Sequence, residues 1–289
     1  MISGTIIKGV GGFYEVKTEK GIYTCKGRGL FRKDQNILYV GDEVEIAENE
    51  SGIGVITKIL PRRNKFIRPP VANVEQMVII MALAKPEPNY VILDKFLVMA
   101  EKNQVSSIVG FNKIDLATPA VRDYADQIYS SLYPTVFLSG KTGEGLDDLK
   151  QLLKGKKNAF AGPSGVGKST LLNKIQESLA LETGKISIKT SRGKHTTRHV
   201  ELYAMDFGGM IFDTPGFTSF EVLEVELEEL ALMYPEFTPY IGKCRFTSCR
   251  HINEPDCAIK SAVTENHIHP SRYQSYQNQY AEIQEKKRY

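Results

Sequence analysis

A glycine-rich run near the middle of the chain has the composition of a phosphate-binding loop. Gly162-Pro163-Ser164-Gly165-Val166-Gly167-Lys168-Ser169 matches the pattern G-x-x-x-x-G-K-S/T, between the apolar run Ala159–Ala161 and the helix-like segment Thr170–Ile175. The glycines let backbone N–H groups surround phosphates, the lysine contacts the outer phosphates, and the serine hydroxyl is a ligand for Mg²⁺. We therefore expect a nucleoside triphosphate to contact Pro163, Ser164, Gly165, Val166, Gly167, Lys168, Ser169 and Thr170.

A second motif, upstream of this loop, selects the base. Asn112-Lys113-Ile114-Asp115 follows a strand-like segment, Ser106–Phe111, and matches the N-K-x-D motif of guanine-specific sites. The aspartate accepts from the ring N1–H and the exocyclic amine of guanine, and a wrong base that leaves this acceptor unpaired is rejected by about 10⁴-fold. Ser139-Gly140-Lys141 resembles the S-A-K loop that contacts the guanine oxygen through a backbone N–H. The expected guanine contacts are Asn112, Lys113, Asp115, Ser139, Gly140 and Lys141.

Downstream of the loop, Asp213-Thr214-Pro215-Gly216 matches the D-x-x-G motif of a nucleotide-sensing switch. Asp213 would hold Mg²⁺ through water, and the N–H of Gly216 would sense the γ-phosphate. Many GTPases place glutamine after this motif to orient the attacking water, but Phe217 stands there and can neither donate nor accept. Intrinsic hydrolysis is therefore expected to be slow unless a partner or another residue completes the site.

The order of these motifs is permuted: the base motif comes first, then the phosphate loop, then D-T-P-G. The same site can form when a chain is cut elsewhere and its old ends are joined, because termini usually lie close together on the surface. The second switch then directly precedes the C-terminal segment. We therefore hypothesise that a nucleotide-driven change at this switch moves the C-terminal domain.

Three cysteines and a histidine are the expected ligands of one structural zinc ion, with reduced structural cysteines as the alternative. They are Cys244, Cys249, His251 and Cys257. Cys₃His is an accepted tetrahedral zinc set, and four protein ligands leave no open position for chemistry. Cys25 lies far away in a predicted strand and is expected to be a buried apolar residue.

The composition is that of an ordinary soluble protein, with 42% apolar and 25% charged residues among 289. Its longest apolar run, Met77–Ala84, is too short to span a bilayer, and no secretory signal is visible, so we expect a cytoplasmic protein without a membrane partner. The net charge of +3 is mild, but basic residues gather at Arg62–Arg68, Lys185–Val200 and after Tyr240. Three such runs favour an RNA-like polyanion, whereas any single run is more simply a solvated face.

The elements that must position these residues divide the chain into three parts. Short strands before residue 64, at Gly4–Lys8, Phe13–Val16, Ile22–Cys25, Glu43–Ile46 and Val55–Ile59, predict a small barrel of the oligonucleotide-binding (OB) type, with an SH3-like barrel or a plain small β-domain as the alternatives. After an apparent linker at 62–74, apolar runs alternate in part with amphipathic segments such as Val91–Glu101 and Leu146–Leu153, which predicts a mainly parallel α/β sheet. Beyond residue 222 only helices are expected. The predicted multidomain fold is an OB-type barrel (1–64), a circularly permuted α/β P-loop G domain (65–221) and a mainly helical zinc-binding domain (222–289).

Taken together, these features closely resemble the RsgA family, also called YjeQ or YloQ, whose members are GTPases of small ribosomal subunit maturation. The resemblance covers essentially the whole chain. Besides the barrel, the phosphate loop, D-T-P-G and the cysteine–histidine cluster, it includes Asn89–Leu97 and Gly193–Arg198. It implies an OB barrel, a GTPase activity stimulated by the small subunit, and contacts to its rRNA near the decoding region.

The resemblance also points to the residue that replaces the missing glutamine. His195, in the first switch, is the candidate catalytic residue, since a neutral imidazole can position water; the alternative is that it contacts RNA phosphate or packs. The first switch should also supply a threonine hydroxyl to Mg²⁺, and we favour Thr197 over Thr196. The expected magnesium ligands are therefore Ser169, Thr197 and Asp213.

Two functions from different classes fit these observations. One is a GTP hydrolase that acts on assembling small ribosomal subunits and binds GTP and GDP. It would be a monomer that contacts rRNA through the barrel and the zinc domain. The other is a GTP-gated adaptor or chaperone on another RNA, with incidental hydrolysis. A P-loop ATPase or metabolic kinase is disfavoured by Asn112-Lys113-Ile114-Asp115.

Overall fold

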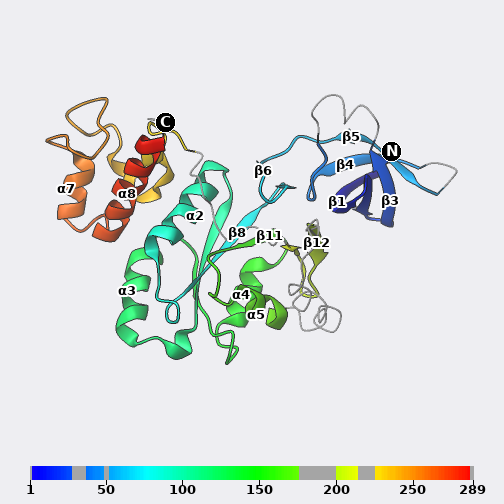
Figure 1. The fold of residues 1–289 in the computed structure, drawn as a ribbon, viewed down its shortest axis with the longest axis horizontal. Helices are drawn as coiled ribbons and strands as arrows, with labels where there is room; N and C mark the ends of the chain where they lie inside the picture. Colours follow the sequence, from blue (N-terminus) through cyan, green and yellow to red (C-terminus); the bar gives the residue numbers. More distant parts are fainter. Residues whose placement is uncertain (1, 28–36, 49–51, 176–199, 214–224, 287–289) are drawn as a thin grey trace. The chain divides into compact units, whose positions relative to one another are not determined.

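The structure is a computed structural model, and it describes residues 2–27, 37–48, 52–175, 200–213 and 225–286. Figure 1 shows the fold, coloured from the N-terminus to the C-terminus. The chain forms two compact units. The first contains residues 1–77, 147–160 and 169–218, and the second contains 78–146, 161–168 and 219–289. Each unit is therefore assembled from segments that are far apart in the sequence.

The N-terminal part of the first unit is a closed barrel, as the strand pattern predicts. Its strands are β1 (Ile2–Val10), β2 (Phe13–Thr18), β3 (Gly21–Gly27), β4 (Glu43–Ala47) and β5 (Gly54–Ile59). They pair in the ring β1–β2–β3–β5–β4–β1, in which only β3 and β5 run parallel. The five-stranded closure confirms the OB-type barrel.

The barrel interior is filled by side chains from alternate strand positions. Ile6, Val16, Cys25 and Val44 have no exposed surface, so Cys25 is the buried apolar residue that its place in the sequence suggests.

An ion pair joins the residue before β4 to the segment that follows β5. The Arg62 guanidinium donates to both oxygens of the fully buried Asp42, at 2.6 and 2.8 Å. Arg62 also lies over the ring of Tyr39, 4.7 Å from its centroid. One member of the first basic run therefore stabilises the barrel and does not contribute a free surface charge.

The segment expected to be a plain linker contains two very short strands, β6 (Lys65–Phe66) and β7 (Val71–Ala72), which pair antiparallel. Val71 also forms a bridge with Val40, and the Asn73 side-chain amide donates to the carbonyl of Gly41 at 3.0 Å. The expectation of a linker was wrong because these strands are too short to show any hydrophobic period.

Among the described residues, the rest of the first unit is built mainly from three strands and two helices. They are α4 (Leu146–Leu153), β11 (Lys157–Ala161), α5 (Lys168–Ile175), β12 (Glu201–Ala204) and β13 (Met210–Asp213). β13 pairs parallel with β11 and antiparallel with β12. β12 also pairs antiparallel with barrel strand β1, with Lys8 opposite Glu201. The barrel therefore continues directly into the neighbouring strands.

In the part of the chain that the structure describes, the second unit is built mainly from three strands and the helices that flank them. They are β8 (Gln76–Ala82), α2 (Tyr90–Lys102), β9 (Ser106–Asn112), the 3₁₀ turn η1 (Ile114–Leu116), α3 (Pro119–Tyr129) and β10 (Thr135–Phe137). β9 lies between β8 and β10 and runs parallel to β10. Every residue of β8 is buried, which explains its continuous apolar sequence. Asn89 caps α2 by accepting from the N–H of Ile92 at 3.1 Å.

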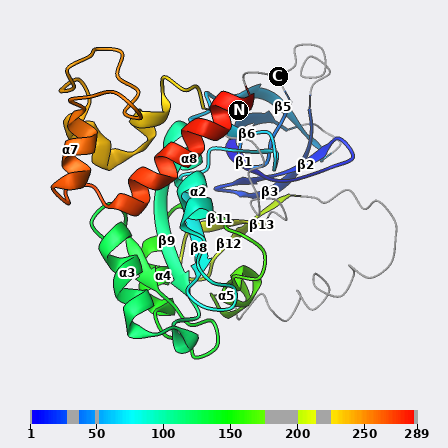
Figure 2. The same ribbon diagram turned by 60° about the vertical axis from the view of Figure 1, so that its left-hand side comes forward.

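The C-terminal part of the second unit is mainly helical, as expected. It contains η2 (Leu230–Met233), η3 (Pro235–Tyr240), α7 (Ala258–Thr264) and α8 (Pro270–Lys286). Its apolar core includes Tyr234, Phe237 and Tyr276, and it also takes in Val98 and Met99 of α2. Figure 2 shows α8 beside α2. α8 is partly buried, with Tyr276 and Ile283 among its buried residues.

Candidate nucleotide site and metal centre

The base motif lies where a buried strand ends. β9 finishes at Asn112, which is almost fully buried and accepts from the N–H of Leu83 through its backbone oxygen at 2.9 Å. Lys113 then adopts a left-handed conformation, with φ of 64°, and η1 begins. This sharp change of direction brings Asp115 to an exposed position just beyond the strand.

The side-chain amide of Asn112 holds two loops together. Its Nδ2 donates to the carbonyl of Val166 in the phosphate loop at 2.8 Å, and its Oδ1 accepts from the N–H of Gly140 at 3.0 Å. An amide suits this position because it carries a donor and an acceptor on one planar group. A Cβ at Gly167 would lie 2.4 Å from Asn112 Nδ2, so glycine is required there by close approach as well as by its positive φ.

Asp115 is oriented by the second guanine loop. The buried Ser139 hydroxyl donates to Asp115 Oδ1 at 2.7 Å and accepts from the N–H of Thr142 at 3.0 Å. The structure thus brings Asp115, Ser139 and Gly140 together, although 24 residues separate Asp115 from Ser139. Lys113 extends the same arrangement by donating to the carbonyls of Gly165, at 2.7 Å, and Lys85.

The phosphate loop has an unusual backbone that only glycine adopts easily. Gly162, Gly165 and Gly167 all have positive φ, and a Cβ at Gly162 would lie 2.2 Å from the carbonyl oxygen of Ile80. The loop leads into α5, whose first residues are Lys168, Ser169 and Thr170. Backbone N–H groups at such a helix start have no partner within the helix, and they can bind anions.

Lys168 is held inside its own loop. Its ammonium donates to the carbonyls of Gly162 and Pro163, at 2.6 and 2.7 Å, and burial lowers its pKa to about 8. A charged ammonium that has lost water gains strongly from a nearby anion. This arrangement is suited to a phosphate group at the loop.

Asp213 is the last residue of β13. The phosphate loop begins after β11, the parallel neighbour of β13. β11 and β13 are parallel, with Ala159 opposite Phe212, so their carboxyl ends lie at the same edge. Burial, and then the nearby Glu201, raise the pKa of Asp213. A desolvated carboxylate beside a second carboxylate fits a cation, which favours its charged form. Gly216, Thr196, Thr197, His195 and Phe217 lie outside the described residues, so their predicted roles remain predictions.

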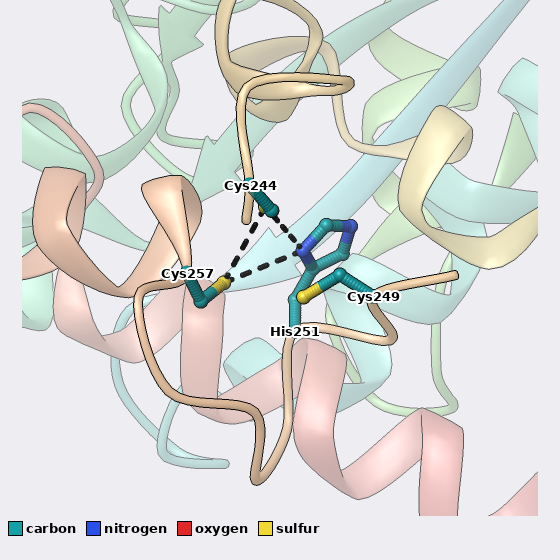
Figure 3. Close-up of side chains that lie close together, drawn as sticks. All are labelled: Cys244, Cys249, His251 and Cys257. Atoms are coloured by element: carbon teal, nitrogen blue, oxygen red, sulfur yellow. Dashed lines mark hydrogen bonds between the residues drawn. The ribbon is translucent and has the colours of Figure 1, made fainter. Parts of the chain in front are cut away.

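The cysteine–histidine cluster brings four ligand atoms into one small volume (Figure 3). The four lie within 4.8 Å of one another, and they belong to Cys244, Cys249, His251 and Cys257. His251 Nδ1 is 3.5 Å from Cys244 Sγ and 3.4 Å from Cys257 Sγ, and the two sulfurs are 3.9 Å apart. The cluster can hold a metal ion, and thiolate with imidazole ligands favour a soft or borderline one.

The ligand loop is fixed by groups that the sequence analysis did not single out. The Glu254 carboxylate accepts from the N–H groups of Arg250, Ile252 and Asn253, at 2.7 to 3.1 Å. Although burial raises the pKa of Glu254, these hydrogen bonds lower it overall. The Tyr273 hydroxyl donates to the carbonyl of His251 at 2.7 Å. In the sequence, the role of Glu254 in fixing this loop was indicated only by its position three residues after the ligand His251.

A buried ion network joins the C-terminal helices to α2 and α3. Arg272 has no exposed surface; it donates to Asp94 of α2 and, at 2.6 Å, to Glu236. The Tyr129 hydroxyl of α3 donates to the same Asp94 at 2.9 Å. Arg272 belongs to the third basic run, so it cannot serve as a surface charge toward RNA. Nothing local in the sequence signals a partner 178 residues away.

Comparisons with known proteins agree with this architecture. The RsgA GTPase family model matches residues 59–223, and the RsgA N-terminal domain model matches residues 3–56. The chain is 47% identical to the small ribosomal subunit biogenesis GTPase RsgA of Caldanaerobacter subterraneus subsp. tengcongensis, covering 99% of this chain and 97% of that protein. It is 45% identical to the protein of the same name from Agathobacter rectalis, covering 100% of both.

Two solved structures are similar over nearly the whole chain. YjeQ from Thermotoga maritima matches with a TM-score of 0.85 and 39% identity, covering 98% of each chain. YloQ, described as a circularly permuted GTPase, matches with a TM-score of 0.84 and 34% identity, covering 99% of this chain and 96% of that one. The permuted motif order and the fold class are thereby confirmed. Among the residues that the structure describes, no helix is both long enough and apolar enough to cross a membrane. This chain belongs to the RsgA family of GTPases.

Proposed function

We propose that this protein hydrolyses GTP in the biogenesis of the small ribosomal subunit, as a monomer in the cytoplasm. Relatives that carry this function in their names match it over essentially their full length. In this proposal the barrel (1–64) and the C-terminal domain (222–289) contact rRNA, and the G domain (65–221) binds GTP and GDP. Exposed basic residues such as Lys17 and Lys20 in the barrel and Lys243 in the C-terminal domain support the RNA contacts.

The observation that carries the proposal is the double role of Asn112. Its amide joins the phosphate loop to the guanine loop through Val166 and Gly140. This link supports a single pre-formed place for a guanine nucleotide in the permuted chain. Asp115 would read the base, and the protonated Lys168 would contact the outer phosphates.

Hydrolysis in this site depends on groups from both switches. Ser169, Thr197 and Asp213 would hold Mg²⁺, which neutralises phosphate charge when it is bound. The N–H of Gly216 would contact the γ-phosphate. His195 would orient the attacking water, because Phe217 cannot. These roles follow from motif positions in the sequence.

Zinc is the metal that the cysteine–histidine cluster fits best. A tetrahedral zinc site with Zn–S of about 2.3 Å and Zn–N of about 2.0 Å has S···S edges of about 3.8 Å and S···N edges of about 3.5 Å. Among Cys244, His251 and Cys257, the separations are 3.9 Å between sulfurs and 3.5 and 3.4 Å from sulfur to nitrogen, and all four ligand atoms lie within 4.8 Å of one another. Cys244, Cys249, His251 and Cys257 would then form a closed structural site.

The experiment that tests the function measures GTP turnover with purified small subunits, large subunits and free rRNA. We expect strong stimulation by small subunits alone, because a partner must complete a site that lacks glutamine. Equal stimulation by free RNA would instead favour a GTP-gated RNA adaptor. No stimulation by any of the three would overturn the proposal.

A second experiment tests His195. His195→Ala should keep its affinity for GTP and lose subunit-stimulated turnover by about 10²-fold or more, the usual contribution of a positioned acid–base group. His267→Ala, which removes an exposed histidine, is the matched control and should behave as the parent protein. Full stimulated turnover in His195→Ala would remove the histidine from the mechanism.

A further inference from the structure

Three charged residues face one another across three neighbouring strands of the first unit. Lys8 of β1 lies opposite Glu201 of β12, and Glu201 in turn lies opposite Asp213 of β13. Lys8 Nζ is 3.1 Å from Glu201 Oε2, and both side chains are partly buried, with 34% and 23% of their surface exposed. The row therefore runs from the barrel to the predicted magnesium ligand.

Residues directly opposite in an antiparallel pair point to the same face of the sheet, with Cβ atoms about 4.5 to 5.5 Å apart. Glu201 and Asp213 thus place two carboxylates side by side, an arrangement that is unfavourable unless a cation lies near them. Lys8 supplies one positive charge, but on the side of Glu201 away from Asp213. A dication at Asp213 would supply the other.

We propose that Glu201 is a positioning residue of the magnesium site, and that its negative charge is shared between the metal and Lys8 of the barrel. The inference rests on the proposed role of Asp213 in holding Mg²⁺. Glu201 increases the negative potential at Asp213 and so tightens Mg²⁺ binding, whereas Lys8 offsets part of that potential. By linkage, Mg²⁺ bound at Asp213 weakens the attraction between Lys8 and Glu201 to the same degree. The barrel and the nucleotide site are therefore coupled through one side chain.

The position of β12 in the chain means that this coupling would act on both predicted switches. β12 connects the predicted first switch to β13, and β13 leads into the predicted second switch. A contact that acts on β12 thus acts on the strand between both switches. Any partner of the barrel that changes how Lys8 engages Glu201 would change the affinity of the site for Mg²⁺.

The test is a titration of Mg²⁺ against the release of a fluorescent GDP analogue, which reports metal affinity without hydrolysis. Glu201→Gln keeps the shape of the side chain and removes its charge. It should raise about fivefold the Mg²⁺ concentration at which half of the GDP analogue stays bound. Lys8→Met should lower that concentration about twofold, and this gain should vanish in the Glu201→Gln background. The thermal melting of each variant checks its folding.

A charge-swapped protein separates electrostatics from strand pairing. Lys8→Glu combined with Glu201→Lys keeps an ion pair between β1 and β12 but puts a positive charge opposite Asp213. Our inference expects the weakest Mg²⁺ binding of the whole set from this protein, whereas a merely structural role for the pair expects binding like that of the parent. Weakening of the same sign in Lys8→Met and Glu201→Gln would also overturn the inference.

Asp213→Asn distinguishes this inference from the function on which it rests. If Asp213→Asn leaves the Mg²⁺ requirement unchanged, the assignment of Asp213 to the metal fails, whatever Glu201 does. If Asp213→Asn raises the requirement and Glu201→Gln does not, only the role of Glu201 fails.

Discussion

The guanine loop and the cysteine–histidine loop are both irregular segments that end in a ligand site, but they are held in different ways. Around Asn112, Asp115 and Ser139, side chains and backbone groups satisfy one another directly through hydrogen bonds. In the cluster, burial is the main cause that raises the pKa of the Cys249 thiol, to about 12. Burial also raises the pKa of the Cys257 thiol and lowers the pKa of the His251 imidazole. The first loop is complete without its ligand, whereas the second needs a cation to offset the cost of bringing thiolates together.

Removing the metal tests this difference most strongly. Cys257→Ala should abolish metal binding and destabilise the C-terminal helices by on the order of 10 kcal/mol, the scale of structural zinc binding. Metal content by mass spectrometry and thermal melting would show both effects. Cys25→Ala, which changes the buried barrel cysteine, is the control and should keep a full complement of metal. A Cys257→Ala protein that melts like the parent would mean that the metal does not organise this domain.

At the guanine loop, by contrast, we expect a loss of recognition without a loss of stability. Asp115→Asn should remove most of the preference for GTP over ATP, which is about 10⁴-fold in sites of this kind, because the acceptor for the guanine donors is lost. Competition binding with GTP, ATP and xanthosine triphosphate measures this. Asp123→Asn, at an exposed position on α3, provides the matched control. An unchanged order of nucleotide preference in Asp115→Asn would contradict a base-reading role.

The buried network around Arg272 sharpens the comparison, because it offers the C-terminal helices a source of stability other than metal. Arg272→Met leaves Asp94 and Glu236 without their cation and should destabilise the protein by about 3 to 5 kcal/mol in denaturant unfolding. Arg245→Met removes an exposed ion pair with Asp256 and should change stability by less than about 1 kcal/mol. Equal effects of the two changes would show that the network adds nothing beyond a surface pair.

The smallest expected effect is a pH dependence of nucleotide binding that originates at Lys168. Its folded pKa of about 8 is below the ordinary 10.5, so between these values the unfolded chain holds more protons and stability rises with pH. Phosphate binding requires the protonated ammonium. GTP affinity should therefore be constant up to about pH 8 and then fall, by at most about tenfold per pH unit. Calorimetric titration between pH 7 and 9 in two buffers would detect the proton taken up, and Lys168→Met should take up none.

Local patterns in the sequence predict the fold well. All five barrel strands, and the six described strands from β8 to β13, lie where apolar runs or alternation indicate them, with ends shifted by a few residues. The phosphate loop and the cluster were found because their chemistry needs several residues within a short span. The structure adds a second reason for glycine at 162 and 167, because a Cβ at these positions would collide with Ile80 and Asn112 respectively.

What the sequence did not reveal are pairings between distant residues. Arg62 and Arg272 count as basic charge in any run, yet Asp42 and Asp94 bind them inside the protein. The two strands at 65–72 are held by contacts with Val40 and Gly41 rather than by their own pattern. Glu201 acquires a possible role only from its register opposite Lys8 and Asp213, and register cannot be read from one strand alone.

The pairing of β1 with β12 also affects the solubility expected of fragments that lack the barrel. With β13 on one side and the barrel on the other, β12 has a hydrogen-bonded neighbour at each edge. A fragment that starts after residue 64 would lose one of them and present a bare strand edge, the kind of template on which chains aggregate. A soluble truncated GTPase would therefore need that edge blocked, for example by a proline or an added lysine on β12.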